Sequence, residues 1–490
     1  MVVASLTAVL ALCVAAPVLA GEPTSETRGF RWIVPEPSRG FVFDGLGSLP
    51  SEEREPETPL IKILRARRNA ITAAGGAGAS PRVQEQSGGT AAEWRALREA
   101  KRDQLAPPEK DGVEAGLAWV EDGHVLPRLR AGWHGFLPTM GGFPSGSGQA
   151  FGVVWTKTGL GVRYPDEDTP NRIDLRGWTA LSLRGYKLAL FETSLHRVAG
   201  TPFHLSALAG WQRNAGDSFF GIGPDSREQD RTSFAQEVPS VGIVAWWQMP
   251  EWLSIGGGVV YRNYSIEPGD DARFPTTGEL FDSTEAPGLD QQPAFLTYDG
   301  FLEIDWRNDG NPYRGGLYTV RLSRWDDLDL DAFDHNDLDV ELHQYFPFLK
   351  DTRVIALRAR TILTDAPTGQ AVPFYLMPRL GGSKELRGFK YGRFTDFNAL
   401  LLSAEYRTEI WLAMDLALFV DAGKVFADHA DLDFHDLRTS YGFGLRVKTS
   451  RSTFLRSDLA FGGESWRWDI TFDNAFEAIP MARRILRMVQ

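Results

Sequence analysis

Apolar and polar residues alternate with a period of two through most of the chain between about residue 125 and residue 476. Residues 441–448 read Tyr-Gly-Phe-Gly-Leu-Arg-Val-Lys, and residues 466–473 read Trp-Arg-Trp-Asp-Ile-Thr-Phe-Asp. In a β-strand, this alternation places the apolar side chains on one surface and the polar side chains on the other. The pattern therefore predicts a series of strands, each with one apolar face and one polar face.

The length and the polar face of these segments distinguish a membrane protein from a soluble one. A soluble β-sandwich shows the same alternation, with its polar face in water outside. Here the segments run to about ten residues and their polar faces mix both signs of charge, which suits strands that cross a bilayer at a tilt around a wet lumen. A closed barrel also pairs every backbone polar group, as lipid requires. We therefore predict an all-β fold, an antiparallel transmembrane β-barrel.

Sixteen strands account for the alternation, and an even number is typical of bacterial outer-membrane barrels. We predict them at residues 125–137, 149–157, 173–183, 186–196, 202–213, 231–247, 253–266, 293–307, 314–324, 336–347, 352–363, 398–409, 413–422, 439–448, 453–461 and 465–476. With both barrel ends in the periplasm, the periplasmic turns are short and most outer loops are long, which is the expected asymmetry. The connections 184–185 and 158–172 break this rule, so the first three strands fit the pattern least well.

Residues 1–20 have the features of a secretory signal peptide. They carry no charge, contain a long apolar stretch and end in Val-Leu-Ala before Gly21, which is a small-residue cleavage site. The alternative is a lipoprotein signal at Cys13, although Leu12 stands where that signal needs a small residue. A cleaved signal predicts an exported mature chain without cysteine.

Residues 21–124 lack the alternation. They include a Pro/Glu-rich stretch and, at residues 73–80, the sequence Ala-Ala-Gly-Gly-Ala-Gly-Ala-Ser. Such stretches bury too little apolar surface to offset backbone entropy. We predict a disordered, low-complexity periplasmic segment with one helix at residues 92–104; a folded module is the alternative. The barrel then occupies residues 125–476, and residues 477–490 form a short basic tail.

Composition excludes several classes of function. The chain has 490 residues and a formal net charge of −12, which argues against a nucleic-acid partner. Beyond the N-terminus it has no apolar run of about 20 residues, the length that a membrane-spanning helix needs. Its one cysteine excludes disulfide scaffolds, thiolate zinc sites and a cysteine nucleophile in the mature chain.

Three short motifs occur in the order of the predicted strands. They are Leu386-Arg387-Gly388-Phe389 in the longest outer loop (residues 364–397), Glu405 in the twelfth strand, and Phe419-Val420-Asp421-Ala422-Gly423 in the thirteenth. In these residues the chain resembles the bacterial surface antigen, or BamA-like, family of outer-membrane protein-translocating barrels. That family has a [Val/Ile/Leu]-Arg-Gly-[Phe/Tyr] tetrad in its sixth outer loop, an inward carboxylate in its twelfth strand and a Phe-x-Asp-x-Gly motif in its thirteenth.

The position of the tetrad arginine also follows from the chemistry of its predicted neighbours. If the loop folds back into the lumen, Arg387 meets Glu405 and Asp421 on the inner faces of adjacent strands. A guanidinium fork pairs with two carboxylates in a fixed geometry, and the partly screened lumen strengthens each contact. We expect Gly388 to allow a tight backbone turn beside the wall and Phe389 to fill a lumen pocket. The alternative is a solvated loop arginine.

The resemblance implies a role in outer-membrane protein assembly or polypeptide translocation, in the outer membrane of a Gram-negative bacterium. The expected partners are outer-membrane lipid and lipopolysaccharide, the barrel assembly machinery that inserts the chain, and an unidentified polypeptide cargo; we expect a monomer. The aromatic last strand, residues 465–476, suits recognition by that machinery through strand addition. Larger family members carry polypeptide-transport-associated domains, and residues 21–124 show no copy, so the chain is similar to the short branch.

Other chemistry has weak support in the sequence. The motifs G-x-S-x-G and H-E-x-x-H are both absent, so we expect no enzyme activity and no cofactor. Two acidic outer loops, residues 326–334 and 428–436, offer oxygen and imidazole ligands that suit a divalent cation. Neither has the glycine and terminal glutamate of an EF-hand, and acidic surface loops are usually solvated. We therefore predict no metal site.

Two classes of function remain open. A polypeptide-transport or assembly barrel predicts a lumen blocked by the sixth outer loop and little steady conductance. A diffusion porin or structural surface antigen predicts an open, ion-conducting pore. An enzyme, such as a barrel protease or a lipid A deacylase, ranks third because no motif places a Ser/His/Asp set. Conductance before and after removal of residues 364–397 separates the first two classes.

Overall fold

The computed structural model describes residues 135–140, 143, 146–161, 169–308, 312–349, 352–411, 414–448, 453–471 and 480–486. The predicted signal peptide (residues 1–20) and the predicted low-complexity segment (residues 21–124), with its helix at residues 92–104, lie outside the described residues. So does most of the first predicted strand (residues 125–137), of which residues 135–137 are described; the observed strand begins at Phe136 and ends at Met140.

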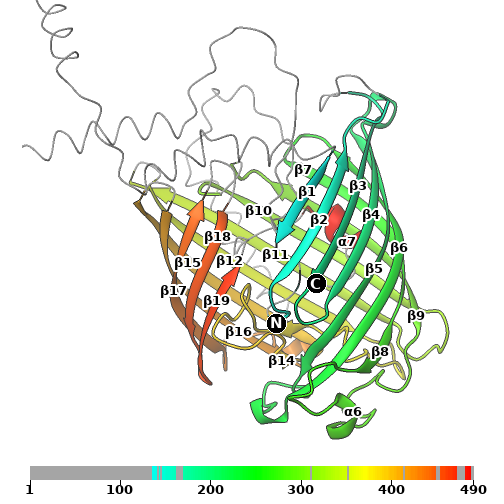
Figure 1. The fold of residues 1–490 in the computed structure, drawn as a ribbon, viewed down its shortest axis with the longest axis vertical. Coiled ribbons are helices and arrows are strands. Elements are labelled where there is room, and N and C mark those ends of the chain that lie inside the picture. Colours follow the sequence, from blue (N-terminus) through cyan, green and yellow to red (C-terminus); the bar gives the residue numbers. More distant parts are fainter. Residues whose placement is uncertain are drawn as a thin grey trace, which may run out of the picture. The chain divides into compact units, whose positions relative to one another are not determined.

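One antiparallel sheet makes up the barrel (Figure 1). Its segments are β1 (Phe136–Met140), β2 (Ala150–Lys157), β3 (Arg172–Ser182), β4 (Lys187–His196), β5 (Phe203–Phe219), β6 (Thr232–Gln248), β7 (Leu253–Asn263), β8 (Ser265–Pro268), β9 (Ala294–Asp305), β10 (Gly315–Asp327), β11 (His335–Phe348), β12 (Arg353–Asp365), β15 (Asn398–Trp411), β16 (Met414–Phe426), β17 (Arg438–Lys448), β18 (Thr453–Phe461) and β19 (Trp466–Thr471). Both β7 and β8 pair with β6, so they are two parts of one interrupted strand. The 17 segments therefore form sixteen strands, as the alternation predicts.

Neighbouring strands in the chain are also neighbours in the sheet, and their register keeps the polar side chains on one face. Opposite β11, for example, Val320 pairs with Val340 and Arg321 with Asp339. Leu322 is 60% exposed on the outer face, whereas Arg321 is 6% exposed on the inner face. The predicted arrangement, with apolar residues outward and charged residues toward the lumen, is confirmed on these strands.

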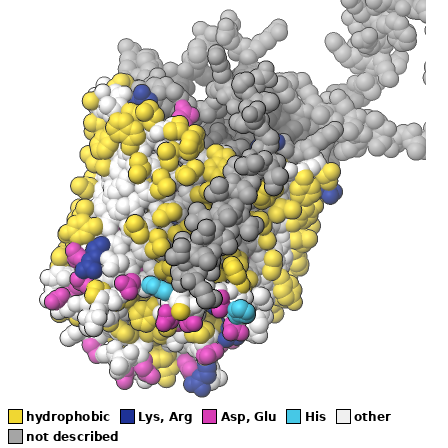
Figure 2. Space-filling model, turned by 180° about the vertical axis from the view of Figure 1, so that it is seen from behind, with side chains coloured by type: hydrophobic (Ala, Val, Ile, Leu, Met, Phe, Trp, Pro, Cys, Tyr) yellow, Lys and Arg dark blue, Asp and Glu magenta, His cyan; other side chains and the backbone are white. Residues whose placement is uncertain are grey.

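The outer wall is apolar over most of its height. Figure 2 shows hydrophobic side chains over much of this surface and charged side chains gathered at one end. On β19 the outward residues Trp466, Trp468 and Ile470 are all more than half exposed. An apolar surface of this extent is typical of a wall that faces lipid. Among the described helices, none is long and apolar enough to cross a membrane.

Of the two longest strands, β5 extends beyond the sequence-based prediction, whereas β6 matches it to within one residue at each end. Each has 17 residues, and their ladder continues through an irregularity between Asn214 and Asp217. The sequence Asn-Ala-Gly-Asp is typical of a turn, and the predicted loop covers residues 214–230. The prediction is wrong for residues 214–219, which continue β5. The strand continues because its polar side chains find partners: Asp217 accepts hydrogen bonds from Asn214 and Tyr186, each at 3.0 Å.

Short elements occur outside the barrel strands. They are η1 (Val198–Gly200), η2 (Glu228–Asp230), α6 (Thr277–Leu280), β13 (Arg379–Leu380), β14 (Phe394–Thr395), η3 (His429–Asp431) and α7 (Met481–Leu486). β13 and β14 pair with each other in the connection between β12 and β15. The helix α7 lies in the segment 477–490, for which the sequence predicts only a basic tail. It packs against β6, β7 and β9, and it is drawn in red in Figure 1.

An aromatic cluster joins the outer loops to the ends of the strands. The ring of Phe374, in the β12–β15 connection, lies 4.8 Å from Phe219 at the end of β5 and 4.9 Å from Phe234 on β6. Each of these three rings is 1% exposed. The cluster also contains Val238, Tyr264, Ile266, Ala286, Phe295, Trp325, Phe333 and Tyr375. It holds the first part of this long connection against β5 and β6.

Candidate functional site

The sixth outer loop, which we define as residues 366–397 between β12 and β15, carries Arg387 into the barrel. The guanidinium donates from Nη1 to Glu405 Oε2 at 2.6 Å. From Nε and Nη2 it donates to the two carboxylate oxygens of Asp421, at 2.9 and 2.8 Å. The Arg387 backbone N–H also donates to Asp421, at 3.2 Å. The guanidinium carbon lies 3.5 Å from the centre of the Phe419 ring. The structure thus brings together the predicted arginine and both predicted carboxylates.

The register of β15 and β16 places the two carboxylates beside each other. Glu405 lies opposite Phe419 and Asp421 lies opposite Ser403, all at inward positions. Arg387 and Asp421 are each 1% exposed and Glu405 is 0% exposed, so the alternative of a solvated loop arginine does not describe this structure. Burial alone lowers the pKa of Arg387, but Asp421 and Glu405 outweigh burial and hold the pKa above its ordinary value.

Glu405 is the centre of a larger charge network. It accepts hydrogen bonds from Arg407 Nε at 2.8 Å and Arg446 Nη2 at 3.1 Å, in addition to Arg387. Arg446 also pairs with Asp458 on β18, which accepts a second bond from Arg456 at 2.9 Å. The motifs do not predict these partners. The alternation along each strand predicts that these side chains point inward. Which of the charges meet depends on the register between the strands.

The apolar members of the motifs pack around the arginine. Leu386 is 0% exposed and Phe389 is 3% exposed. They belong to a cluster with Leu380, Phe394, Ala399, Leu401 and Val425. A Cβ on Gly423 would meet the Leu400 carbonyl oxygen at 2.7 Å and the Leu380 side chain at 3.1 Å. The motif glycine therefore leaves room for the loop to pack directly on the wall.

Gly388 has a different role from the expected one. Its φ is not in the left-handed region, so no tight turn requires it. Instead a Cβ at this position would lie 2.6 Å from the backbone nitrogen of Gly462 and 2.7 Å from the carbonyl carbon of Phe461. Two backbones, one from the loop and one from the β18–β19 connection, therefore touch at this point, and Gly388 is the residue that allows the contact.

Gly388→Ala is expected to destabilise the folded barrel by about 1–3 kcal/mol, because a methyl group there displaces backbone rather than a flexible side chain. Thermal unfolding of the detergent-solubilised protein measures the effect. Gly463→Ala is the matched control, since a Cβ on Gly463 meets nothing within 4 Å. Equal thermal-unfolding midpoints for the two variants would contradict the inference that Gly388 is needed for the close backbone contact.

A second arginine also fixes the loop. Arg393 donates from Nε to Glu464 at 2.8 Å, and from its other nitrogens to the Ser226 hydroxyl at 2.9 Å and carbonyl at 2.6 Å. Its guanidinium lies over the ring of Phe394. The sequence signal is the Gly-Arg-Phe at residues 392–394, a few residues beyond the tetrad. The loop is thus tied to the β18–β19 connection and to the β5–β6 connection.

The opposite edge of the loop contacts β12. Arg358 donates from Nη1 to the Lys384 carbonyl at 2.7 Å, and Arg360 donates to Glu385 at 3.5 Å. Burial raises the pKa of Glu385, against the pull of these two arginines. The same arginines pair with Glu341 and Asp339 on β11. The loop therefore borders an acidic pair on the inner wall.

In each of the two acidic outer loops, an aspartate has protein partners. Asp327 accepts from the backbone N–H groups of Asp329, Leu330, Ala332 and Phe333. Asp433 pairs with Lys424 and accepts from the backbone N–H of His435. In the described residues, no group of three or more His, Cys, Asp and Glu side chains has an arrangement that could hold a metal ion.

Comparison with known families finds a match within the barrel. Residues 253–467 match the Omp85 superfamily domain. The chain carries an Omp85 superfamily domain. The matched range contains the tetrad, Glu405 and the Phe-x-Asp-x-Gly motif, so the BamA-like resemblance seen in those residues is confirmed. The Omp85 match and the strand architecture indicate an outer-membrane protein of a Gram-negative bacterium.

One solved structure shares the fold of this Omp85 barrel, and two others are similar to it at lower scores. BamA from Haemophilus ducreyi lacking POTRA domains 1–3 aligns with a TM-score of 0.51 at 15% identity, over 69% of this chain and 70% of that one. CdiB from Escherichia coli aligns with a TM-score of 0.45 at 12% identity, over 69% and 62% of the two chains. CdiB from Acinetobacter baumannii aligns with a TM-score of 0.39 at 11% identity, over 67% of this chain and 57% of that one. No curated protein matches the chain.

Proposed function

We propose that this Omp85 barrel inserts polypeptides into the outer membrane or moves them across it, and that its sixth outer loop closes the lumen at rest. The observation that carries the proposal is the contact of Arg387 with Glu405 and Asp421, which fastens the loop to the wall from inside. The proposed role uses the barrel wall and lumen rather than bond-making chemistry. Its proposed partners are outer-membrane lipid and lipopolysaccharide, the assembly machinery that inserts the barrel, and a polypeptide cargo.

Several attachments of the loop support a closed resting state. The loop is fixed to β15 and β16 by Arg387, to β12 through Lys384 and Glu385, and to the β18–β19 connection by Arg393. Its first part packs into the aromatic cluster at Phe374. A segment held at so many points of the wall leaves less space for free diffusion than an unoccupied lumen does. The alternative, a diffusion porin or a structural surface antigen, predicts an open pore.

Vesicles that contain the intact barrel are expected to accelerate the insertion or uptake of a small unfolded outer-membrane protein over protein-free vesicles, as read by protease protection. In planar bilayers the same preparation is expected to show little steady conductance. Replacing residues 366–397 with a short glycine–serine linker is expected to produce large steady conductance, because the loop attachments are then gone.

The linker variant must first show the heat-modifiable gel migration of a folded barrel. Large steady conductance of the intact barrel would favour the porin. Protection no greater than in protein-free vesicles would contradict the translocator or insertase role, whatever the conductance.

A further inference from the structure

One part of the inner wall is apolar on both faces. On β6, Val241 and Ile243 are more than half exposed outward, yet the inward Val244 is also apolar and is 1% exposed. Leu208 on β5, Val260 on β7 and Phe301 on β9 continue this patch, and each is 6% exposed or less. A lumen wall in contact with water is normally polar. The patch therefore requires a cover, because exposed contiguous apolar surface is unfavourable in water.

The helix α7 is that cover. Met481, Ala482, Ile485 and Leu486 fall on one helical face, and all four are buried in one cluster with the patch residues. Ile485 packs where the absence of a side chain on Gly258 leaves space: a Cβ there would be 3.1 Å from Ile485 Cγ2. The helix has six residues, and an isolated helix of this length is unstable in water. Its helical form is therefore a consequence of its binding to the wall.

The groove also recognises the two ends of the helix through the helix backbone. Glu303 accepts a hydrogen bond from the Met481 backbone N–H at 2.8 Å, at the end where helix N–H groups lack partners. Arg262 donates to the Ile485 carbonyl at 2.6 Å, at the end where carbonyl groups lack partners. These charges also suit the helix dipole. Neither contact depends on the side chains of the bound helix.

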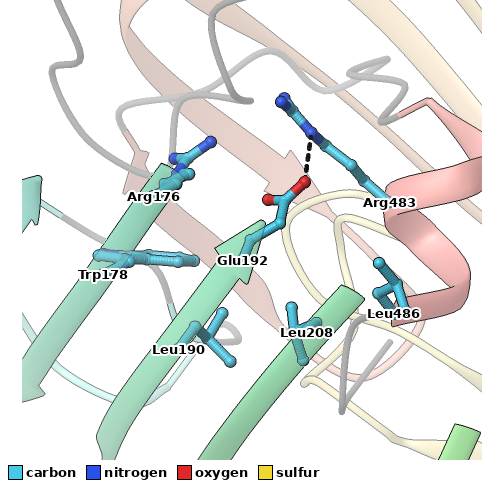
Figure 3. Close-up of a pocket in the computed structure, with 7 residues that line it drawn as sticks. All are labelled: Arg176, Trp178, Leu190, Glu192, Leu208, Arg483 and Leu486. Carbon is cyan, nitrogen blue, oxygen red and sulfur yellow. Dashed lines mark ion pairs between the residues drawn. The ribbon is translucent and has the colours of Figure 1, made fainter. Parts of the chain in front are cut away.

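Acidic side chains along the groove pair with the basic residues of α7. Arg484 donates to Glu341 at 2.7 Å and to Asp339 at 2.6 Å. Arg483 lies 3.5 Å from Glu192, and Figure 3 shows this pair above Leu208 and Leu486. An apolar floor, a carboxylate and an arginine at the two ends, and acidic residues along the rim together match a short basic amphipathic helix.

We propose that this groove, formed by the inner faces of β4 to β7, β9 and β11, is a binding site for a short basic amphipathic helical segment of a polypeptide client. The helix α7 is its resident ligand and competes with the client. This inference rests on the proposed function, because it takes the client to be a polypeptide handled by the barrel. The site borders the sixth outer loop, since Asp339 and Glu341 hold both Arg484 of α7 and the arginines of β12 that contact the loop.

The test uses the full chain in detergent and a fluorescent peptide with the sequence of residues 478–490. A tethered ligand has an effective concentration near millimolar, so the intact chain is expected to bind the free peptide weakly. Ile485→Asp removes the apolar anchor of α7 without changing the barrel strands. This variant is expected to bind the peptide at least about ten-fold more tightly, as measured by anisotropy. Arg484→Glu, which places like charges beside Asp339 and Glu341, releases α7 independently and should behave in the same way.

Two controls define the site. Adding Glu341→Gln and Asp339→Asn to the Ile485→Asp chain should abolish most of the gained binding. A peptide with the arginines at positions 483 and 484 replaced by glutamate should not bind. Absence of gained peptide binding in both released variants, each with the heat-modifiable migration of a folded barrel, overturns the groove proposal and leaves the proposed function intact. If the peptide binds but vesicles show no polypeptide insertion or uptake, the groove stands as a helix-binding site and the proposed function fails.

Discussion

Arg387→Ala is expected to detach the sixth outer loop from the barrel wall, at a cost of about 3–5 kcal/mol, because it removes a cationic partner from two buried carboxylates. Asp421 loses a bidentate contact and a cation, and Glu405 loses its shortest hydrogen bond. The folded form should convert to the unfolded form at a lower temperature in the heat-modifiable gel shift. Steady conductance in planar bilayers should rise toward that of the variant without the loop.

Two substitutions control this result. Arg387→Lys keeps the charge but not the planar fork, so an intermediate effect is expected. Arg273→Ala removes an arginine that pairs with Asp271 in an exposed outer loop, where its side chain is 61% exposed, and should leave both readouts unchanged. If Arg387→Ala behaves like Arg273→Ala, the loop is held by other contacts and the anchor role is wrong.

Glu405→Gln is expected to destabilise the barrel by a similar amount, about 3–5 kcal/mol, since one carboxylate accepts from three buried arginines. A glutamine at this position retains the shape of the side chain but removes the charge, and its amide NH₂ turns a donor toward guanidinium donors. The contacts affected are those from Arg387 at 2.6 Å, Arg407 at 2.8 Å and Arg446 at 3.1 Å. Thermal unfolding in detergent, followed by tryptophan fluorescence, measures the loss.

The control for this change is Glu267→Gln, because the Glu267 side chain is 55% exposed and pairs only loosely with Arg213 at 3.7 Å. Combining Glu405→Gln with Arg387→Ala should be non-additive by about 0.5–3 kcal/mol, as for residues in one network. Additive effects, or a Glu405→Gln midpoint equal to that of Glu267→Gln, would show that the network carries little stability.

Much of the barrel could be predicted because a strand repeats every two residues and lipid imposes one apolar face on it. The sequence around Tyr441 and that around Trp466 both have this period, and their apolar side chains face outward. The same two-residue alternation places Glu405 and Asp421 on the inner face, so their contact with a loop arginine could be predicted. The extension of β5 past Asn214 could not, because a local turn sequence was overridden by partners from other segments.

The charge network and the helix α7 could not be predicted from the sequence, for two separate reasons. Asp458 and Arg446 meet through the register of β17 and β18, and a shift of one residue in that register would move them to opposite faces. For α7, six residues are too few for a helical period to be recognised, and the helix is stable only in its groove. The basic residues of this segment are visible, but their acidic partners lie on strands more than a hundred residues earlier.

The sequence by itself determined the strand number, the outward apolar face and the contact of Arg387 with Glu405 and Asp421, because each follows from a local period or from a short motif. The tertiary structure alone decided what occupies the lumen. Only the pairing of β6, β7 and β9 brings Val244, Val260 and Phe301 into one apolar patch. Burial against that patch is what stabilises the helix of residues 481–486.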